Sequence, residues 1–377
     1  MNFLNSFIDQ LKPYQVASHK VWEVSESERD MMLKLDWNEG TIAPSPRVKE
    51  ELEILMMDET LYRLYPPTYS QRLMQLLSDY TKLPEENIQY FGSSDSLQEY
   101  VSRAVLDRGD VVLMVGPTYD NFRLSAEAQG AELVFFEMDA PFNMEVKALI
   151  SAIEQIRDSG ADGGRLKMVY VCNPNNPTGS SLSEQEVMQL VDAFPDVLFF
   201  VDEAYFEFNG STVSKYVGDR NNLLVSRTFS KAFCLAGFRI GYLLGNSDLI
   251  VGISKIRNSK SITIFAQAAA CAALEDLDYM QNYIHEVSKA RDIFIDFLKS
   301  NSSKVTVFDS IGNFVLMRFC DAFEKEGTLA HLNDHDIYVR NLTHSRKLDN
   351  CLRISVGTVE QMERVILVMD SRWRSEL

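Results

Sequence analysis

The stretch MVYVCNPNNPTGSSLSEQEVMQLVDAFPDVLFFVDEAY, from Met168 to Tyr205, decides the fold. It opens with the apolar run Met168–Cys172, continues through a polar turn to an amphipathic stretch at Glu184–Ala193, and returns to an apolar run at Val197–Val201. Ser183 followed three residues later by Glu186 is typical of the capping box that starts a helix. A strand, a helix and a second strand in this order predict two parallel strands joined by a crossover helix.

The same alternation extends on both sides of this unit. Further helical stretches, such as Ser96–Leu106, lie between most of the apolar runs. We therefore expect an α/β fold whose large domain has a mostly parallel seven-stranded sheet flanked by helices. The seven expected strands are Ile88–Phe91, Val111–Val115, Glu132–Phe136, Met168–Cys172, Val197–Val201, Leu223–Ser226 and Arg239–Leu244.

The rhythm changes after about residue 275, which predicts a second, smaller α+β domain. A long helix at about Tyr279–Lys299 is followed by short strands, a short helix and a final helix from about Val359. We expect residues 46–275 to form the large domain and residues 276–377 the small one, with residues 1–45 contributing to the small domain. Residues 23–30, EVSESERD, read as a solvated loop. The expected small-domain strands are Lys304–Phe308, Asn313–Arg318, Ile337–Arg340 and Leu352–Ser355.

Composition excludes several classes of function. The chain has 377 residues, is 46% hydrophobic and carries a formal net charge of −17, which disfavours nucleic acid and anionic membrane surfaces as partners. Its five scattered cysteines form no CxxC pair, so we expect neither a disulfide framework nor a metal site. The first residues, MNFLNSFIDQLKPY, lack the features of a secretory signal, and we expect a cytoplasmic protein.

The segment TFSKAFCLAGFRIGY, from Thr228 to Tyr242, suggests covalent chemistry. Lys231 follows an expected strand and stands beside the hydroxyls of Thr228 and Ser230, and Arg239 comes eight residues later. A lysine can form an imine with an aldehyde, while hydroxyls and a guanidinium bind phosphate. A single lysine is more often an ordinary solvated side chain, but this set suits a cofactor that carries both an aldehyde and a phosphate.

Three other segments end expected strands at the same edge of the sheet, where ligands bind in open parallel sheets. Asp202 ends one strand and suits a partner for a protonated ring nitrogen, although an aspartate there can also be a plain helix cap. The turn NPNNPTG at Asn173–Gly179 is long and unusual, and it can fix an asparagine amide against the cofactor. The turn FGSSDS at Phe91–Ser96 precedes a helix, where free N–H groups cradle phosphate.

Taken in order, these segments resemble the fold type I pyridoxal-phosphate aminotransferases of class I/II, and within them most closely the histidinol-phosphate aminotransferases. The likeness runs from about Leu11 to the end and includes Lys12-Pro13-Tyr14, Leu35–Glu39 and Leu64-Tyr65-Pro66. It implies pyridoxal 5′-phosphate as cofactor, bound covalently to Lys231, with Asp202 holding the ring nitrogen and Tyr119 stacking on the ring. It implies that the phenolate oxygen of the cofactor is bound by Asn176 and Tyr205, and that its phosphate is bound by Ser93, Ser94, Asp95, Thr228, Ser230 and Arg239. It implies a homodimer in which Tyr65 reaches the phosphate bound in the neighbouring subunit. It also implies that the substrate is bound by Asn38, Arg340 and Arg353.

The sequence departs from that family at three places. Ser96 replaces the usual glutamate after the aspartate of the phosphate turn, Cys234 stands where a smaller residue is common, and Gly40 stands where a second asparagine is usual. These departures leave the cofactor chemistry intact and affect the identity of the substrate.

The expected reaction is transfer of an amino group between an amino acid or phosphorylated amine, such as histidinol phosphate, and a 2-oxo acid such as 2-oxoglutarate. Arg340 ends one expected strand and Arg353 lies thirteen residues on, in the next, so both can face one cleft and bind two anionic groups. Arg340 could instead pair with Asp336 at the surface. Three alternatives remain: a phospho-amino-acid decarboxylase of the threonine-phosphate type, an aromatic amino-acid aminotransferase, and an inactive relative with a binding role.

Overall fold

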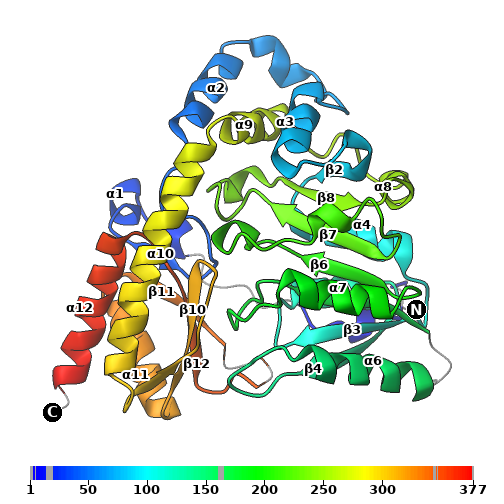
Figure 1. The fold of residues 1–377 in the computed structure, drawn as a ribbon. Helices are drawn as coiled ribbons and strands as arrows, with labels where there is room; N and C mark the ends of the chain where they lie inside the picture. The colour runs from blue at the N-terminus through cyan, green and yellow to red at the C-terminus, as the bar shows by residue number, and fades with distance from the viewer. Residues whose placement is uncertain are drawn as a thin grey trace.

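The computed structural model describes residues 3–4, 6–13, 20–159, 165–342, 345 and 347–375. These residues form two β-sheets, one of seven strands and one of five, each with its own helices. In Figure 1 the seven-stranded sheet and the five-stranded sheet stand side by side, and the long helix α10 runs along the smaller one.

The seven-stranded sheet has the order β2-β8-β7-β6-β5-β3-β4. All neighbouring pairs from β7 to β4 are parallel, and only β8 is antiparallel to both of its neighbours. The expected mostly parallel seven-stranded sheet is confirmed. Its strands are β2 (Ile88–Phe91), β3 (Val111–Gly116), β4 (Glu132–Glu137), β5 (Leu166–Cys172), β6 (Leu198–Asp202), β7 (Leu223–Thr228) and β8 (Gly241–Gly245).

Helices cover both faces of this sheet, and local sequence signals fix where they begin. At the start of α7, Ser183 accepts a hydrogen bond from the Glu186 N–H at 3.3 Å, and the Glu186 carboxylate accepts one from the Ser183 N–H at 2.7 Å, which is the predicted capping box. Helices α6 and α7 contact each other, and α4 contacts α5 and α8. The helices are α4 (Ser94–Val105), α5 (Asn121–Glu127), α6 (Val146–Ser159), α7 (Glu184–Ala193), α8 (Ser247–Ser254) and α9 (Ile264–Leu274).

The five-stranded sheet has the order β1-β11-β12-β10-β9 and packs against α10 and α11, and α12 packs against these two helices. Its edge strand β1 comes from the N-terminal segment and pairs in parallel with β11, so that Leu33 lies opposite Ile337. The division into domains at residues 45 and 275 stays a prediction. The elements are β1 (Leu33–Leu35), α10 (Leu277–Ser300), β9 (Val305–Val307), β10 (Phe314–Phe319), α11 (Ala322–Asp334), β11 (Ile337–Asn341), β12 (Cys351–Ser355) and α12 (Val359–Ser375).

The structure corrects two local expectations. The segment expected as a loop contains the short helix α1 (Glu26–Arg29), because Ser25 and Glu28 form a second capping box. The expected strand at Arg239–Leu244 begins only at Gly241, because Arg239 adopts left-handed backbone angles (φ 51°) that no strand accommodates.

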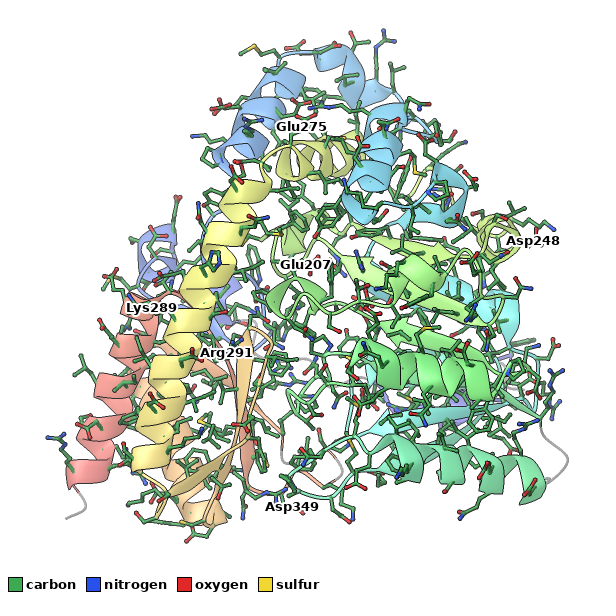
Figure 2. The ribbon with its side chains drawn as sticks, viewed as in Figure 1. Glu207, Asp248, Glu275, Lys289, Arg291 and Asp349 are labelled. Atoms are coloured by element: carbon green, nitrogen blue, oxygen red, sulfur yellow. The ribbon has the colours of Figure 1, made fainter. Side chains whose placement is uncertain are left out.

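Two helices that the sequence pattern did not predict, α2 (Pro46–Met56) and α3 (Gln71–Thr81), pack against α9. The Arg72 guanidinium on α3 bonds the Glu275 carboxylate at 2.8 Å, and Figure 2 shows Glu275 at the junction of α9 and α10. Within the described ranges, no helix is both long and apolar enough to cross a bilayer.

Candidate active site

The ends of three neighbouring parallel strands define the candidate site. In the sheet register, Cys172 at the end of β5 lies opposite Asp202 at the end of β6, and Asp202 lies opposite Ser226 on β7. The chain then leaves each strand into a segment that carries expected site residues, including Asn176, Tyr205 and Lys231. The shared direction of the strands therefore brings together residues that lie up to 55 positions apart in the sequence.

Asp202 is 2% exposed and is held by uncharged donors. Its Oδ2 accepts hydrogen bonds from Gln98 Nε2 and from the Tyr170 hydroxyl, each at 2.9 Å. Its Oδ1 accepts from Ser226 Oγ at 3.1 Å and from the Ala204 N–H at 3.2 Å. Burial outweighs these bonds and raises the pKa of Asp202 to about 6. A cationic group placed against this carboxylate would restore its charged form.

Lys231 points its amine toward the N-terminal segment. Its Nζ donates to the backbone carbonyl of Trp37 at 2.8 Å. Burial, and then the positive charge of Arg353, lower the pKa of the Lys231 amine to about 8. An amine with this pKa is partly neutral near neutral pH, which is the form that attacks an aldehyde.

Tyr205 and Asn176 each form a hydrogen bond with a residue from outside the seven-stranded sheet. The Tyr205 hydroxyl accepts a hydrogen bond from Asn38 Nδ2 at 3.0 Å, and burial raises the pKa of this phenol, so that it stays protonated. Arg353 Nη1 donates to Asn176 Oδ1 at 2.6 Å, which turns the other side of that amide, its Nδ2, into the donor available to a ligand.

The phosphate-binding segments converge on Gly241. A Cβ atom at Gly241 would lie 3.0 Å from the Ser94 nitrogen and 2.7 Å from the Arg227 carbonyl oxygen, so only glycine lets β8 pass between the start of α4 and the end of β7. Ser93 caps α4 by accepting from the Ser96 backbone N–H at 3.1 Å. On β7, Thr228 donates to Ser230 Oγ at 2.9 Å. The start of α4 thus lies on one side of Gly241, and the end of β7 with the hydroxyls of Thr228 and Ser230 lies on the other. This arrangement fits the phosphate of the expected cofactor.

The Asp95 carboxylate has three protein partners in this cluster. Its carboxylate accepts from the Tyr119 hydroxyl at 2.9 Å, from Asn121 Nδ2 at 3.3 Å and from Arg239 Nη2 at 2.8 Å. Because a carboxylate repels a phosphate, we expect only the Asp95 backbone N–H to serve the phosphate. The side chain instead fixes the positions of Tyr119 and Arg239, the residues expected at the ring and at the phosphate.

Arg340 and Arg353 lie directly opposite each other on the antiparallel strands β11 and β12, so their side chains share one face of the small sheet. Both line a cavity of about 1110 Å³ together with Tyr119 and Asn176. The alternative partner for Arg340, Asp336, accepts from the Tyr338 hydroxyl at 3.1 Å. The expected convergence of two guanidinium groups on one cleft is therefore present.

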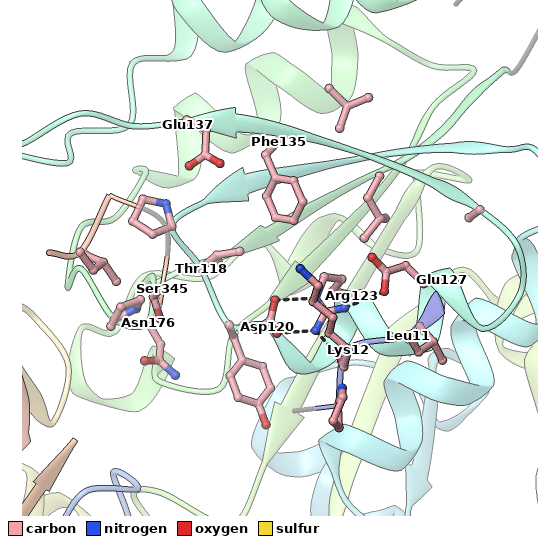
Figure 3. Close-up of a pocket in the computed structure, with 18 of the residues that line it drawn as sticks. Leu11, Lys12, Thr118, Asp120, Arg123, Glu127, Phe135, Glu137, Asn176 and Ser345 are labelled. Carbon is pink, nitrogen blue, oxygen red and sulfur yellow. Dashed lines mark hydrogen bonds and ion pairs between the residues drawn. The ribbon is translucent and has the colours of Figure 1, made fainter. Parts of the chain in front are cut away.

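The N-terminal segment that includes Leu11 and Lys12, called the N-terminal arm below, forms another wall of this cavity (Figure 3). The arm carbonyl of Lys12 accepts from Arg123 Nη2 at 3.1 Å, and Arg123 also bonds Asp120 and Glu127. In Figure 3, Leu11 and Lys12 lie at one end of the cavity and Asn176 at the other. Tyr14, the last residue of the expected N-terminal motif, lies outside the described residues.

The structure shows no direct substrate contact for Asn38 and no contact with the cofactor segments for Tyr65 among the described residues. Asn38 is fully buried and uses its amide on Tyr205 and Ser355, so the structure gives it a positioning contact, and its substrate-binding role stays a prediction. Tyr65 is 82% exposed, with the Lys260 amine 4.7 Å from its ring centre. This exposure leaves Tyr65 available to a second subunit.

Two of the departures from the family pattern are in contact with each other. A Cβ atom at Gly40 would lie 2.3 Å from Cys234 Sγ and 2.9 Å from its Cβ. The larger side chain at position 234 thus occupies the space that a side chain at position 40 would need. The departures at positions 40 and 234 are therefore sterically coupled. Cys234 lies three residues after Lys231, and Gly40 lies three residues after Trp37.

Sequence reasoning missed Trp37, Gln98 and Tyr170 as contacts of the site. Trp37 acts through its backbone carbonyl, which no side-chain pattern reveals. Gln98 and Tyr170 lie within a helix and a strand, where one polar residue in a buried face carries no recognisable signal.

Comparison with known proteins agrees with this geometry. A family model described as aminotransferase class I and II matches residues 30–368. The chain is 41% identical over 370 residues to the dihydroxyacetone phosphate transaminase of Campylobacter jejuni subsp. jejuni serotype O:2, and this match covers 96% of this chain and 95% of that relative. It is 34% identical over 343 residues to the histidinol-phosphate aminotransferase of Roseiflexus castenholzii, and this match covers 90% of this chain and 89% of that relative.

A solved structure shows the same fold. The histidinol-phosphate aminotransferase of Sinorhizobium meliloti, in complex with pyridoxal-5′-phosphate, matches with a TM-score of 0.86 at 24% identity and covers 100% of this chain and 99% of that one. The family match spans most of the chain, and the strand-end residues fit the cofactor. The chain therefore belongs to the class I and II aminotransferases and is a pyridoxal 5′-phosphate enzyme of fold type I.

Proposed function

We propose that this aminotransferase exchanges an amino group between a small phosphorylated substrate and a dicarboxylic amino acid or its 2-oxo acid. The observation that carries the proposal is the pair Arg340 and Arg353, which face one cavity from opposite positions on β11 and β12. Two guanidinium groups suit a phosphate in one half-reaction and two carboxylates in the other, because a guanidinium binds either group through paired hydrogen bonds.

The names of the relatives support a particular skeleton. Dihydroxyacetone phosphate is HO–CH₂–CO–CH₂–OPO₃²⁻, and replacing the amine of histidinol phosphate by a carbonyl gives imidazolyl–CH₂–CO–CH₂–OPO₃²⁻. Both are ketones with a phosphate ester on the neighbouring carbon, and neither has a carboxylate beside the carbonyl. We propose this ketone phosphate, or the corresponding amine, as the substrate class.

The cofactor, when bound, supplies an electron sink for the carbanion that forms at the substrate carbon. Lys231 Nζ, aligned by the Trp37 carbonyl, takes and returns the proton at that carbon. With the cofactor bound, Asp202 would balance the charge of the protonated ring nitrogen, and Asn176 and Tyr205 would hold the phenolate oxygen. Arg353, 7% exposed, grips an anionic group of the substrate and so sets which bond at the reacting carbon is aligned for cleavage.

We also propose that the active form is a homodimer. Tyr65 lies within an exposed apolar surface spanning residues 54–69, and a large apolar surface of this kind is unusual on a monomer. The exposed side chains of this surface are Ile54, Met56, Met57, Tyr62, Leu64, Tyr65 and Tyr69. Light scattering should give twice the mass of one chain, and a fully active monomer would contradict this proposal.

A donor screen tests the substrate. The donors are histidinol phosphate, serinol phosphate, phosphothreonine and phenylalanine, each with 2-oxoglutarate, and the products are analysed for glutamate, carbonyl compound and CO₂. We expect a phosphorylated amine to exceed phenylalanine in kcat/KM. CO₂ from phosphothreonine without glutamate would instead support the decarboxylase, and preference for phenylalanine would support the aromatic aminotransferase.

A further inference from the structure

Gln98 is a buried polar residue to which none of the roles above gives a function. It lies on the second turn of α4, is 0% exposed, and donates from Nε2 to Asp202 Oδ2 at 2.9 Å. Its carbonyl oxygen Oε1 is buried and has no hydrogen-bond partner among the described residues. The reverse orientation of the amide would set Oε1 against the carboxylate, so the donor orientation is the favourable one.

The unpartnered Oε1 makes an amide an unfavourable choice for packing alone. Burying an amide oxygen without a partner costs free energy, whereas an apolar side chain of the same length would fill the space without that cost. If position 98 served only to fill the core, an apolar residue would therefore be more favourable there than glutamine. What offsets the cost is the one bond that the amide does make, to Asp202.

Asp202 depends on uncharged donors, Gln98 among them together with Tyr170, Ser226 and the Ala204 N–H, because burial raises its pKa and no cation is among the described titratable groups that act on it. Among the described residues, the titratable side chains that interact electrostatically with Asp202 include Asp95, Tyr170, Cys172 and Tyr205, none of which is a cation. Asp95 raises the pKa of Asp202 further, in the same direction as burial. Gln98 donates a hydrogen bond without carrying a charge or a titratable proton, so it favours the carboxylate at every pH.

We propose that Gln98 is a positioning residue for the cofactor ring, which keeps Asp202 ionised and anchors its Oδ2 so that the carboxylate receives the protonated ring nitrogen. Tyr170 shares Oδ2, but its ring is stacked on Phe122 at 4.4 Å between centres and also serves the core. Among the described residues, the Gln98 side chain has a hydrogen bond to Asp202 and to no other group. The proposal concerns cofactor binding and does not depend on which amine is the substrate.

The test measures binding of pyridoxal 5′-phosphate to the apoenzyme through its visible absorbance, in Gln98→Met and Gln98→Glu. Methionine removes the donor and keeps the length of the side chain. Glutamate keeps the shape and places an acid against Asp202. We expect the dissociation constant to rise about 10- to 100-fold in Gln98→Met, as for loss of a hydrogen bond to a charged group, and to rise further in Gln98→Glu.

The matched control is Ser102→Ala, one turn later on the same helix, where a fully buried hydroxyl also has no partner among the described residues. It should bind the cofactor like the unaltered protein. As a second readout, cofactor affinity is measured as a function of pH. The fall in affinity on the acid side, called the acid limb, should move to higher pH in Gln98→Met, because Asp202 then protonates more readily. A residue that only fills space would not move this limb.

The order of the two variants decides the outcome. If Gln98 only packs, the isosteric glutamate should bind the cofactor more like the unaltered protein than methionine does, and that order would overturn the proposal. Unchanged affinity in both variants would overturn it as well. Thermal melts of the apoproteins show whether each variant is folded, and an unfolded Gln98→Glu leaves the decision to the affinity and acid limb of Gln98→Met. Since no amino substrate is present, failure here leaves the proposed substrate class untouched.

Discussion

The two halves of the active site are built differently. In the cofactor half, Asp202 ends β6 and Lys231 follows the adjacent strand β7, so the register of one sheet places both residues. In the substrate half, Arg340 and Arg353 come from the small sheet, and the N-terminal arm supplies another wall. The comparison suggests that the chemistry is fixed by one rigid element, whereas substrate choice depends on how three separate segments meet.

The largest effect is expected in the cofactor half, at Lys231. Replacing Lys231 by alanine removes the covalent link and the proton carrier, so turnover should fall by at least about a thousandfold. Borohydride reduction followed by peptide mass spectrometry should find the cofactor on Lys231 in the unaltered protein and nowhere in the variant. The exposed Lys255→Ala serves as control, and label retained in Lys231→Ala would refute the assignment.

The next largest effect is expected at Arg353, where the two halves touch. Arg353→Met leaves Asn176 without its guanidinium partner and the substrate anion without its counterion. The loss in kcat/KM should correspond to about 2–5 kcal/mol. Lysine should not restore it, because one ammonium cannot reproduce the paired hydrogen bonds. Arg374→Met, at an exposed ion pair on α12, is the control, and equal kcat/KM in both variants would make Arg353 structural.

A smaller and selective effect is expected at Arg340. Arg340→Gln should lower kcat/KM about tenfold for phosphorylated amines, as for one hydrogen bond to a charged group, and leave phenylalanine nearly unaffected. The measurement is the ratio of the two rates in the unaltered protein and in the variant. A ratio that does not change would remove Arg340 from the phosphate site and with it the main support for the phosphorylated substrate.

The cofactor half was also the easier half to predict. Polar residues that follow buried strands must meet at one edge of a parallel sheet, so Asp202 and Lys231 could be placed from the sequence alone. Gln98 could not, because its contact with Asp202 joins positions 104 residues apart and its helix shows no local sign of it. The role of the Asp95 carboxylate was also missed, since a sequence shows that an acid is present but not which partners it faces.

The smallest effect concerns pH and links the two halves. The pKa of the Lys231 amine is lowered to about 8, first by burial and then by Arg353. Only the neutral amine reacts with the aldehyde, so cofactor attachment to the apoenzyme should accelerate about fivefold from pH 7 to pH 8 and level off soon above, whereas an unperturbed lysine would continue to accelerate toward pH 10. The reaction of Nα-acetyl-lysine measures the pH dependence of the cofactor itself and is the control.

Stability should respond to the same pKa in a defined direction. Between about pH 8 and pH 10.5 the unfolded lysine holds a proton that the folded one has lost, so this group makes the apoprotein more stable as pH rises through that window. In Arg353→Met the positive charge beside the amine is gone, and both the plateau of attachment and the start of this window should move to higher pH. A plateau that stays in place would mean that Arg353 does not contribute to the pKa of the lysine and that the substrate half does not tune it.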